Sequence, residues 1–217
     1  MNRLLRTLLV FLLPALCAPA QAEDSIAIRD RRELALERGT ARPSHHLSLV
    51  LAYFEGGWTP EVIRSALRKS ARLLEQCGVA ITKAELVLLA APARFHDFHT
   101  PDSRELASAL PLGKPTIYFV ADTRQQPAFD AEAIGRGNSG TRPELKDTVW
   151  VVRGARDLDI VLAHELAHVL MDSGEHSVEP GNLMREDTAP QNNYLSGTQC
   201  ARLRDTATAN GLLQPVR

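Results

Sequence analysis

The sequence predicts a single-domain α/β (α+β) protein in which a twisted mixed sheet packs against helices. Short apolar runs rich in strand-forming residues alternate with segments whose apolar residues recur at helical spacing. The chain has 217 residues, of which 44% are hydrophobic and 24% are charged, as in an ordinary globular domain. These values exclude a disordered, a collagen-like or a polytopic membrane protein.

Four strands are expected, at residues 46–54, 81–91, 116–121 and 148–152. The short apolar runs among them are typical of strands buried in a sheet. We expect polar connections elsewhere, at residues 94–115 and 123–147, and a loop as long as the second is either a functional rim or disordered. The order of strands and helices indicates a layered architecture.

Three helices are expected. The first begins at Pro60 and ends at Gly78, which are favoured residues for these two positions. The second occupies residues 157–171, where the apolar pattern is helical. The third begins at Ser196, where the spacing of Ser196 and Gln199 fits a capping box.

Residues 1–22 have the pattern of a removable export signal. A basic start precedes an apolar run from Leu8 to Leu16, and Ala20-Gln21-Ala22 supplies a small-x-small cleavage site. The run is well short of the roughly 20 residues that a membrane-spanning helix needs. We therefore expect a bacterial periplasmic or secreted protein with no stable membrane insertion after signal removal.

The rest of the chain divides into a flexible arm or short pro-segment at residues 23–44 and a globular domain at residues 45–217. Its two cysteines, Cys77 and Cys200, lie on the apolar faces of expected helices, so they are either buried thiols or a disulfide. An oxidising compartment favours the disulfide. The formal net charge of -1 gives no strong attraction to nucleic acid. We expect a monomer with no nucleic-acid partner.

The motif that most clearly indicates a chemical function is His164-Glu165-Leu166-Ala167-His168, inside the second expected helix. Histidines four residues apart project from the same face of a helix, so two imidazoles can bind one cation. Zinc suits this arrangement, because a catalytic zinc takes three protein ligands and leaves one position for water. Glu165 lies beside His164, where it can accept a proton from that water as a general base.

The third ligand is expected just beyond this helix. His176 follows His168 by eight residues, and Gly174 between them lets the chain turn back toward the metal. His176 is favoured because imidazole suits zinc and because it follows the turn. Four carboxylates are the alternatives: Asp172, Glu175, Glu179 and Glu186.

The pattern resembles the metzincin clan of zinc metallopeptidases, which contains matrixins and astacins. The residues that carry the resemblance are His164-Glu165-Leu166-Ala167-His168, Gly174, His176 and Asn182-Leu183-Met184. It implies that His164, His168 and His176 bind one Zn²⁺, that Glu165 is the base and that Met184 forms the floor of the site. It also implies a single metzincin-like domain with an active-site helix and a C-terminal helix.

The sequence departs from the family pattern in several places. Family members usually place the third histidine six residues after the second, and Met171 stands here at the family's glycine position. Gly174 is therefore expected to make the turn from a shifted place. Glu186 stands where some members carry an auxiliary tyrosine ligand, for which Tyr194 is a remote substitute. No cysteine precedes Cys77 after signal removal, so a cysteine-switch propeptide is not expected.

Other polar residues are interpreted as structural. His96 and His99 lie in a polar connection without helical spacing, and His45 and His46 flank the first expected strand, so we expect surface histidines. Ser139 lies between glycines without a nucleophile-elbow pattern, and a serine hydrolase is not supported.

The function that fits these patterns is an exported zinc endopeptidase that hydrolyses protein or peptide substrates with a zinc-activated water and Glu165 as base. An envelope zinc hydrolase acting on cell-wall peptides or amides would use the same site chemistry. A non-catalytic metal-binding or interaction module is the alternative from another class.

Overall fold

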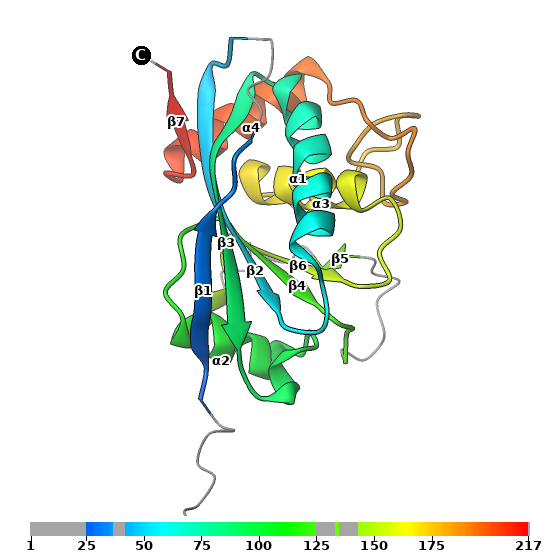
Figure 1. Cartoon of the computed structure of the whole chain (residues 1–217). Helices are drawn as coiled ribbons and strands as arrows, with labels where there is room; N and C mark the ends of the chain where they lie inside the picture. The colour runs from blue at the N-terminus through cyan, green and yellow to red at the C-terminus, as the bar shows by residue number, and fades with distance from the viewer. Residues whose placement is uncertain (1–24, 37–41, 125–132, 135–142, 217) are drawn as a thin grey trace, which may run out of the picture.

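The computed structural model describes residues 25–36, 42–124, 133–134 and 143–216. The expected export signal, Ser139 and most of the connection at 123–147 lie outside these residues. The described part of the chain is a single mixed α/β domain, so the predicted fold class is confirmed (Figure 1). None of its helices is long and apolar enough to cross a membrane.

The described strands form one sheet. They are β1 (Ala27–Glu33), β2 (His45–Phe54), β3 (Val79–Ala90), β4 (Thr116–Val120), β5 (Ala133–Ile134), β6 (Thr148–Val152) and β7 (Leu213–Pro215). Their order is β1-β3-β2-β4-β6-β5, and β7 pairs with the start of β2. The central strands β3, β2, β4 and β6 are parallel, whereas β1, β5 and β7 run antiparallel to their neighbours.

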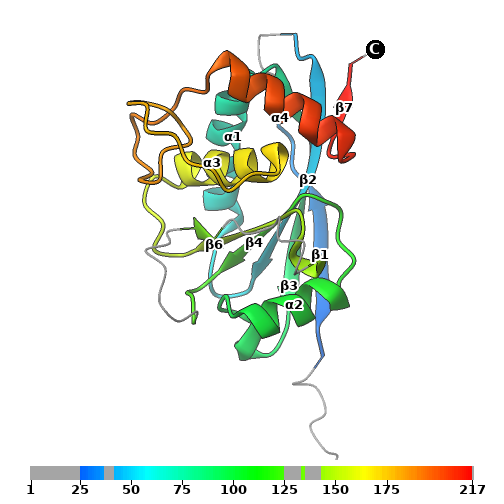
Figure 2. The same cartoon turned by 180° about the vertical axis from the view of Figure 1, so that it is seen from behind.

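Helices cover both faces of this sheet. The α-helices are α1 (Pro60–Glu75), α2 (Thr100–Ala109), α3 (Leu158–Met171) and α4 (Gly197–Ala209), and the short 3-10 helices are η1 (Ala93–Phe95) and η2 (Pro143–Leu145). Along β2, Leu49 and Leu51 belong to the core shared with α1, α3 and α4, and Val50 and Ala52 belong to the core under α2. Figure 2 shows α2 on the far side of the sheet from α3 and α4. Burial on both faces explains the continuous apolar runs that identified these strands.

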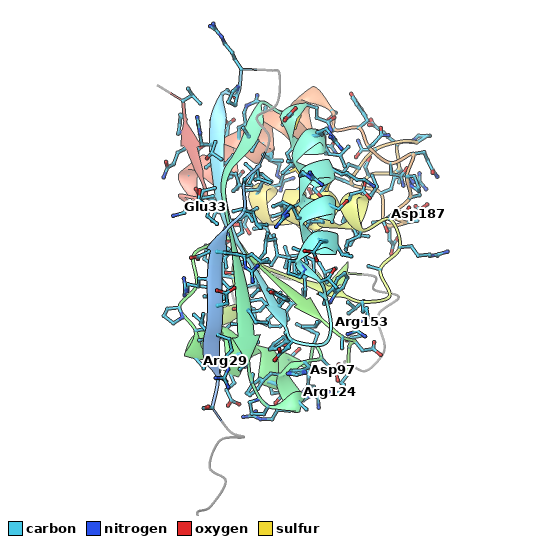
Figure 3. The ribbon with its side chains drawn as sticks, in the orientation of Figure 1. Arg29, Glu33, Asp97, Arg124, Arg153 and Asp187 are labelled. Atoms are coloured by element: carbon cyan, nitrogen blue, oxygen red, sulfur yellow. A yellow bond between two sulfur atoms is a disulfide. The ribbon has the colours of Figure 1, made fainter. Side chains whose placement is uncertain are left out.

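One edge of the sheet was not expected. Residues 23–44 were predicted to be a flexible arm, but residues 27–33 form β1, which pairs with β3. Figure 3 shows Arg29 and Glu33 on this strand, and both are exposed. Arg31 pairs across the strands with Glu85 at 3.0 Å. Charged side chains are common on edge strands, where they discourage pairing with other chains. Because this strand has so many charged residues, its sequence lacks the apolar pattern by which strands are predicted.

Five further elements of the described residues were missed: η1, α2, β5, η2 and β7. The polar connection at residues 94–115 contains η1 and α2, and residues 213–215 form β7. Helix α2 is short, and its buried side chains are only Ser103 and Leu106, so it lacks a clear apolar period. It carries a proline in its first turn, a position where proline is favoured.

Helix α3 lies inside the molecule. All residues from Ile160 to Met171 are buried, which includes both histidines of the motif. Ser70 of α1 donates its hydroxyl to the carbonyl of Asp159 at 2.8 Å, so α1 holds the start of α3. The position of the motif is therefore determined by packing on several sides.

A disulfide joins the two helices that flank α3. Cys77, just after α1, is bonded to Cys200 of α4, with their Cα atoms 4.8 Å apart, as expected for an oxidising compartment. Arg204 of α4 also donates to the carbonyl of Cys77 at 2.9 Å. The end of α1 and the start of α4 are thus held together covalently across 123 residues of sequence.

Replacing both Cys77 and Cys200 by serine should lower the free energy of unfolding by about 2–4 kcal/mol, because the crosslink restricts the unfolded chain by closing a long loop. Urea denaturation of the oxidised protein and the double variant measures this difference. Equal stability, or two alkylatable thiols found by mass spectrometry without reduction, would contradict the disulfide.

Candidate metal centre

Three imidazoles converge beside the second half of the buried helix α3. Nε2 of His168 lies 2.9 Å from Nε2 of His164 and 3.2 Å from Nε2 of His176. The candidate ligand atoms of all three residues lie within 4.8 Å of one another. His164 and His168 are buried, whereas His176 is exposed on the segment that follows α3. The structure therefore brings together the three histidines that the sequence singled out.

Backbone carbonyls orient the two buried rings. Nδ1 of His164 donates to the carbonyl of Leu183 at 2.7 Å, and Nδ1 of His168 donates to the carbonyl of Ser173 at 2.6 Å. A carbonyl only accepts, so the Nδ1 atom of each ring carries the hydrogen. In the neutral rings, Nε2 then carries a lone pair, which is the form that binds a metal.

Burial keeps these rings neutral. It lowers the pKa of His164, and together with the nearby His164 it lowers the pKa of His168 to about 4. Two neutral Nε2 atoms 2.9 Å apart cannot hydrogen-bond to each other, because neither has a hydrogen to donate. A shared cation turns this repulsion of lone pairs into attraction.

Two of the nitrogen separations in the cluster are close to those of ligands around one zinc ion. Two nitrogen ligands of a tetrahedral zinc, each at 2.0–2.1 Å from the metal, lie about 3.3 Å apart. The observed separations of 2.9 and 3.2 Å are close to this value. Three histidine ligands also leave one coordination position open, as in catalytic zinc sites.

The turn that returns the chain to the cluster begins at the end of α3. Asp172 has a φ of 47°, in the left-handed region, and its backbone N–H faces the carbonyls of His168 and Val169. Ser173 follows, and its N–H donates to the carbonyl of His168 at 3.2 Å. The prediction that Gly174 makes this turn was wrong, because Gly174 does not have a positive φ. Aspartate tolerates the left-handed conformation better than most residues.

A second turn supplies the carbonyl that holds His164. It comprises residues 182–184, and Leu183 at its centre donates its N–H to the carbonyl of Tyr194 at 2.6 Å. Met184 is buried in the core shared with α3, and its carbonyl accepts from the N–H of Ser177, next to His176, at 2.7 Å. The turn is thus connected to the segments of two of the three histidines.

Glu165 follows His164 on α3 and is buried, with 7% of its surface exposed. The alternative ligands do not join the cluster: among the described residues, only the three histidines form a group that could hold a metal. Glu175 instead accepts from Arg202 at 2.7 Å, and Glu179 accepts from Asn182 at 3.3 Å.

Three of the other four histidines have partners of their own. His96 packs against the ring of Phe54, and His99 pairs with Asp102 at 2.9 Å. His45, half-buried at the start of β2, lies 2.9 Å from the hydroxyl of Ser44. In the described residues none of these belongs to a metal-binding group.

Sequence reasoning missed the groups that orient the ligands. Two of them are the backbone carbonyls of Ser173 and Leu183, which no side-chain pattern can reveal. The side chain of Asn182, fully buried beside Leu183, accepts from the N–H of Met184 at 2.9 Å, and sequence reasoning assigned it no role of its own. A polar residue that adjoins a proposed metal-site turn was the available signal.

Comparison with known proteins supports the fold. No protein-family model matches the chain, and no curated protein matches it. The structure is similar to that of metalloproteinase-II from Bacteroides fragilis, with a TM-score of 0.54 and 16% sequence identity. The similarity covers 80% of this chain and 57% of the other, so this chain spans a little over half the length of that protein. At this identity the likeness shows a shared fold.

Replacing His176 by alanine should weaken zinc binding by more than about 100-fold, because a lost ligand removes more affinity than a lost hydrogen-bonding partner of a ligand. Competition with a chromophoric chelator measures the dissociation constant. His99→Ala is the matched control and should bind zinc like the wild type. Equal losses in His176→Ala and Glu186→Ala would contradict the assignment of His176.

Proposed function

We propose that the chain is an exported, zinc-dependent endopeptidase of the metzincin type. The observation that carries the proposal is the convergence of Nε2 atoms from His164, His168 and His176, with the buried Glu165 next to His164 in the sequence of α3. The fold likeness to a bacterial metalloproteinase supports the same class of activity.

In this proposal His164, His168 and His176 hold one zinc ion. Their separations, and the neutral state of the two buried rings, suit that metal better than a harder cation, which would prefer oxygen ligands. When bound, zinc would act as a Lewis acid and lower the pKa of a coordinated water towards neutrality.

Glu165 serves as the general base. Its place next to His164 on α3 puts the carboxylate on the same helix as two ligands, and burial of that helix keeps its backbone rigid. The carboxylate accepts a proton from the water that attacks the peptide carbonyl. It then donates this proton to the leaving amine as the C–N bond breaks, so that the base is regenerated.

The remaining assignments follow from the same proposal. Met184 forms part of the floor of the site, and residues 45–217 together with β1 form the peptidase domain. Residues 1–22 are the export signal, and the disulfide between Cys77 and Cys200 supports an oxidising destination such as the periplasm or the extracellular medium. The substrates are proteins or peptides, and hydrolysis of a peptide library compared with that of muropeptides separates this activity from cell-wall hydrolysis.

Replacing Glu165 by glutamine should leave zinc binding intact and lower peptide hydrolysis by about 10²–10⁴-fold, because general-base catalysis contributes a factor of this size. The measurements are zinc content per chain and kcat/KM on a peptide substrate.

The matched control is Glu61→Gln, the same change at an exposed position of α1. It should retain wild-type kcat/KM. Bound zinc without turnover of any peptide, in the wild type as in Glu165→Gln, would instead identify a non-catalytic metal-binding module.

A further inference from the structure

Two amide side chains are paired at the turn that orients His164, one from the turn itself and one from α4. Nδ2 of Asn182 donates to Oε1 of Gln199 at 2.9 Å, and Nε2 of Gln199 donates back to Oδ1 of Asn182 at 3.1 Å. Asn182 is fully buried, and Gln199 is half-buried in the first turn of α4. Reciprocal bonds of this kind set the relative position and rotation of two side chains, since both ends must be satisfied together.

The amide of Asn182 continues into the metal site. Its Oδ1 atom also accepts from the backbone N–H of Met184 at 2.9 Å. Leu183 lies between these two residues, and its carbonyl accepts from Nδ1 of His164 at 2.7 Å. Asn182 therefore closes a small ring of backbone around the carbonyl that orients His164.

Gln199 is held in turn by the start of α4. Its Oε1 accepts from the N–H of Ser196 at 2.8 Å, and its own N–H donates to the hydroxyl of Ser196 at 3.2 Å, which completes a capping box. The next residue, Cys200, is bonded to Cys77. The amide pair thus connects the turn to a helix end that is covalently anchored.

The other disulfide partner has a similar neighbour. Gln76, next to Cys77, accepts from the N–H of Leu195 at 2.7 Å and donates to the carbonyl of Asn193 at 3.1 Å. These two residues flank Tyr194, whose carbonyl accepts from the N–H of Leu183. Both sides of the Leu183 turn are therefore held from the disulfide-linked ends of α1 and α4.

We propose that Asn182 and Gln199 act as a positioning pair that sets the zinc affinity of the site by holding the Leu183 carbonyl against His164. This role rests on the zinc binding proposed above. Without the pair, the turn has several accessible conformations, and the His164 ring loses its fixed tautomer and orientation. Hydrogen-bonding partners of metal-binding histidines typically contribute about 10- to 100-fold to metal affinity.

The test measures the zinc dissociation constant of the full chain by chelator competition and the thermal midpoint of the metal-free protein. Asn182→Ala and Gln199→Ala should each weaken zinc binding by about 10- to 100-fold. The double variant should lose little more than either single variant, because the two amides act as one unit. Thr198→Ala is the matched control, since it changes an exposed side chain in the same first turn of α4 and leaves the amide pair and its capping box in place, and it should keep the wild-type zinc affinity.

Gln199→Glu separates positioning from capping and serves if the alanine variants do not fold. Glutamate is as suitable as glutamine at this position of a capping box, so α4 keeps its cap. A carboxylate oxygen would face Oδ1 of Asn182 in place of a donor, and zinc binding should weaken by about 10-fold.

Unchanged zinc affinity in Gln199→Glu and the alanine variants, with only the thermal midpoint lowered, would overturn the positioning role. A wild-type chain that binds no zinc would overturn the proposed function and this inference together. The two failures are thus distinguishable in the same set of measurements.

Discussion

The structure depends on the burial of α3, which removes two imidazoles from water. Desolvation keeps the rings of His164 and His168 neutral, and two backbone carbonyls determine which nitrogen of each ring carries the hydrogen. Burying such polar rings is unfavourable unless their hydrogen-bonding groups are satisfied. Each Nδ1 is satisfied by a carbonyl, and the Nε2 atoms converge where a cation fits. The arrangement that buries and orients the rings therefore leaves a group of nitrogen atoms that could hold a metal.

Two turns in the segment between α3 and α4 hold the histidine rings in position. At Asp172, whose backbone is in the left-handed conformation, the chain turns back towards His168. The turn at residues 182–184 contacts His164 through the carbonyl of Leu183. The disulfide joins the helices that hold this second turn. The residues next to Cys77 and Cys200, which are Gln76 and Gln199, are also the ones that bond to the region of this turn.

Pattern analysis of the sequence predicts the elements that are buried on both faces. The strand at residues 148–152 was predicted with the observed bounds, and the helix at residues 157–171 differs from α3 by one residue. Strand β1 was not predicted because an exposed edge strand needs no apolar period, and α2 was not predicted because it buries too few apolar side chains. The pattern of apolar residues reflects which side chains are buried, so an element that buries few side chains cannot be predicted from it.

In the site, too, some features could be predicted from the sequence and others could not. The three histidines were identifiable because helical spacing and residue chemistry point to one cation, and the structure places them together. The turn at Asp172 was assigned to Gly174 because glycine is the usual left-handed residue, whereas the conformation here is adopted by an aspartate. The bonds from Asn182 and Gln199 join residues 17 positions apart, and only the folded chain brings them together.

The central claim is that three imidazoles share one zinc ion, and anomalous diffraction at the zinc absorption edge tests it most directly. Crystals of the full chain grown with zinc should show a single strong peak about 2.0–2.1 Å from the Nε2 atoms of His164, His168 and His176. A peak bound by carboxylates instead, or no peak near these histidines, would contradict the account.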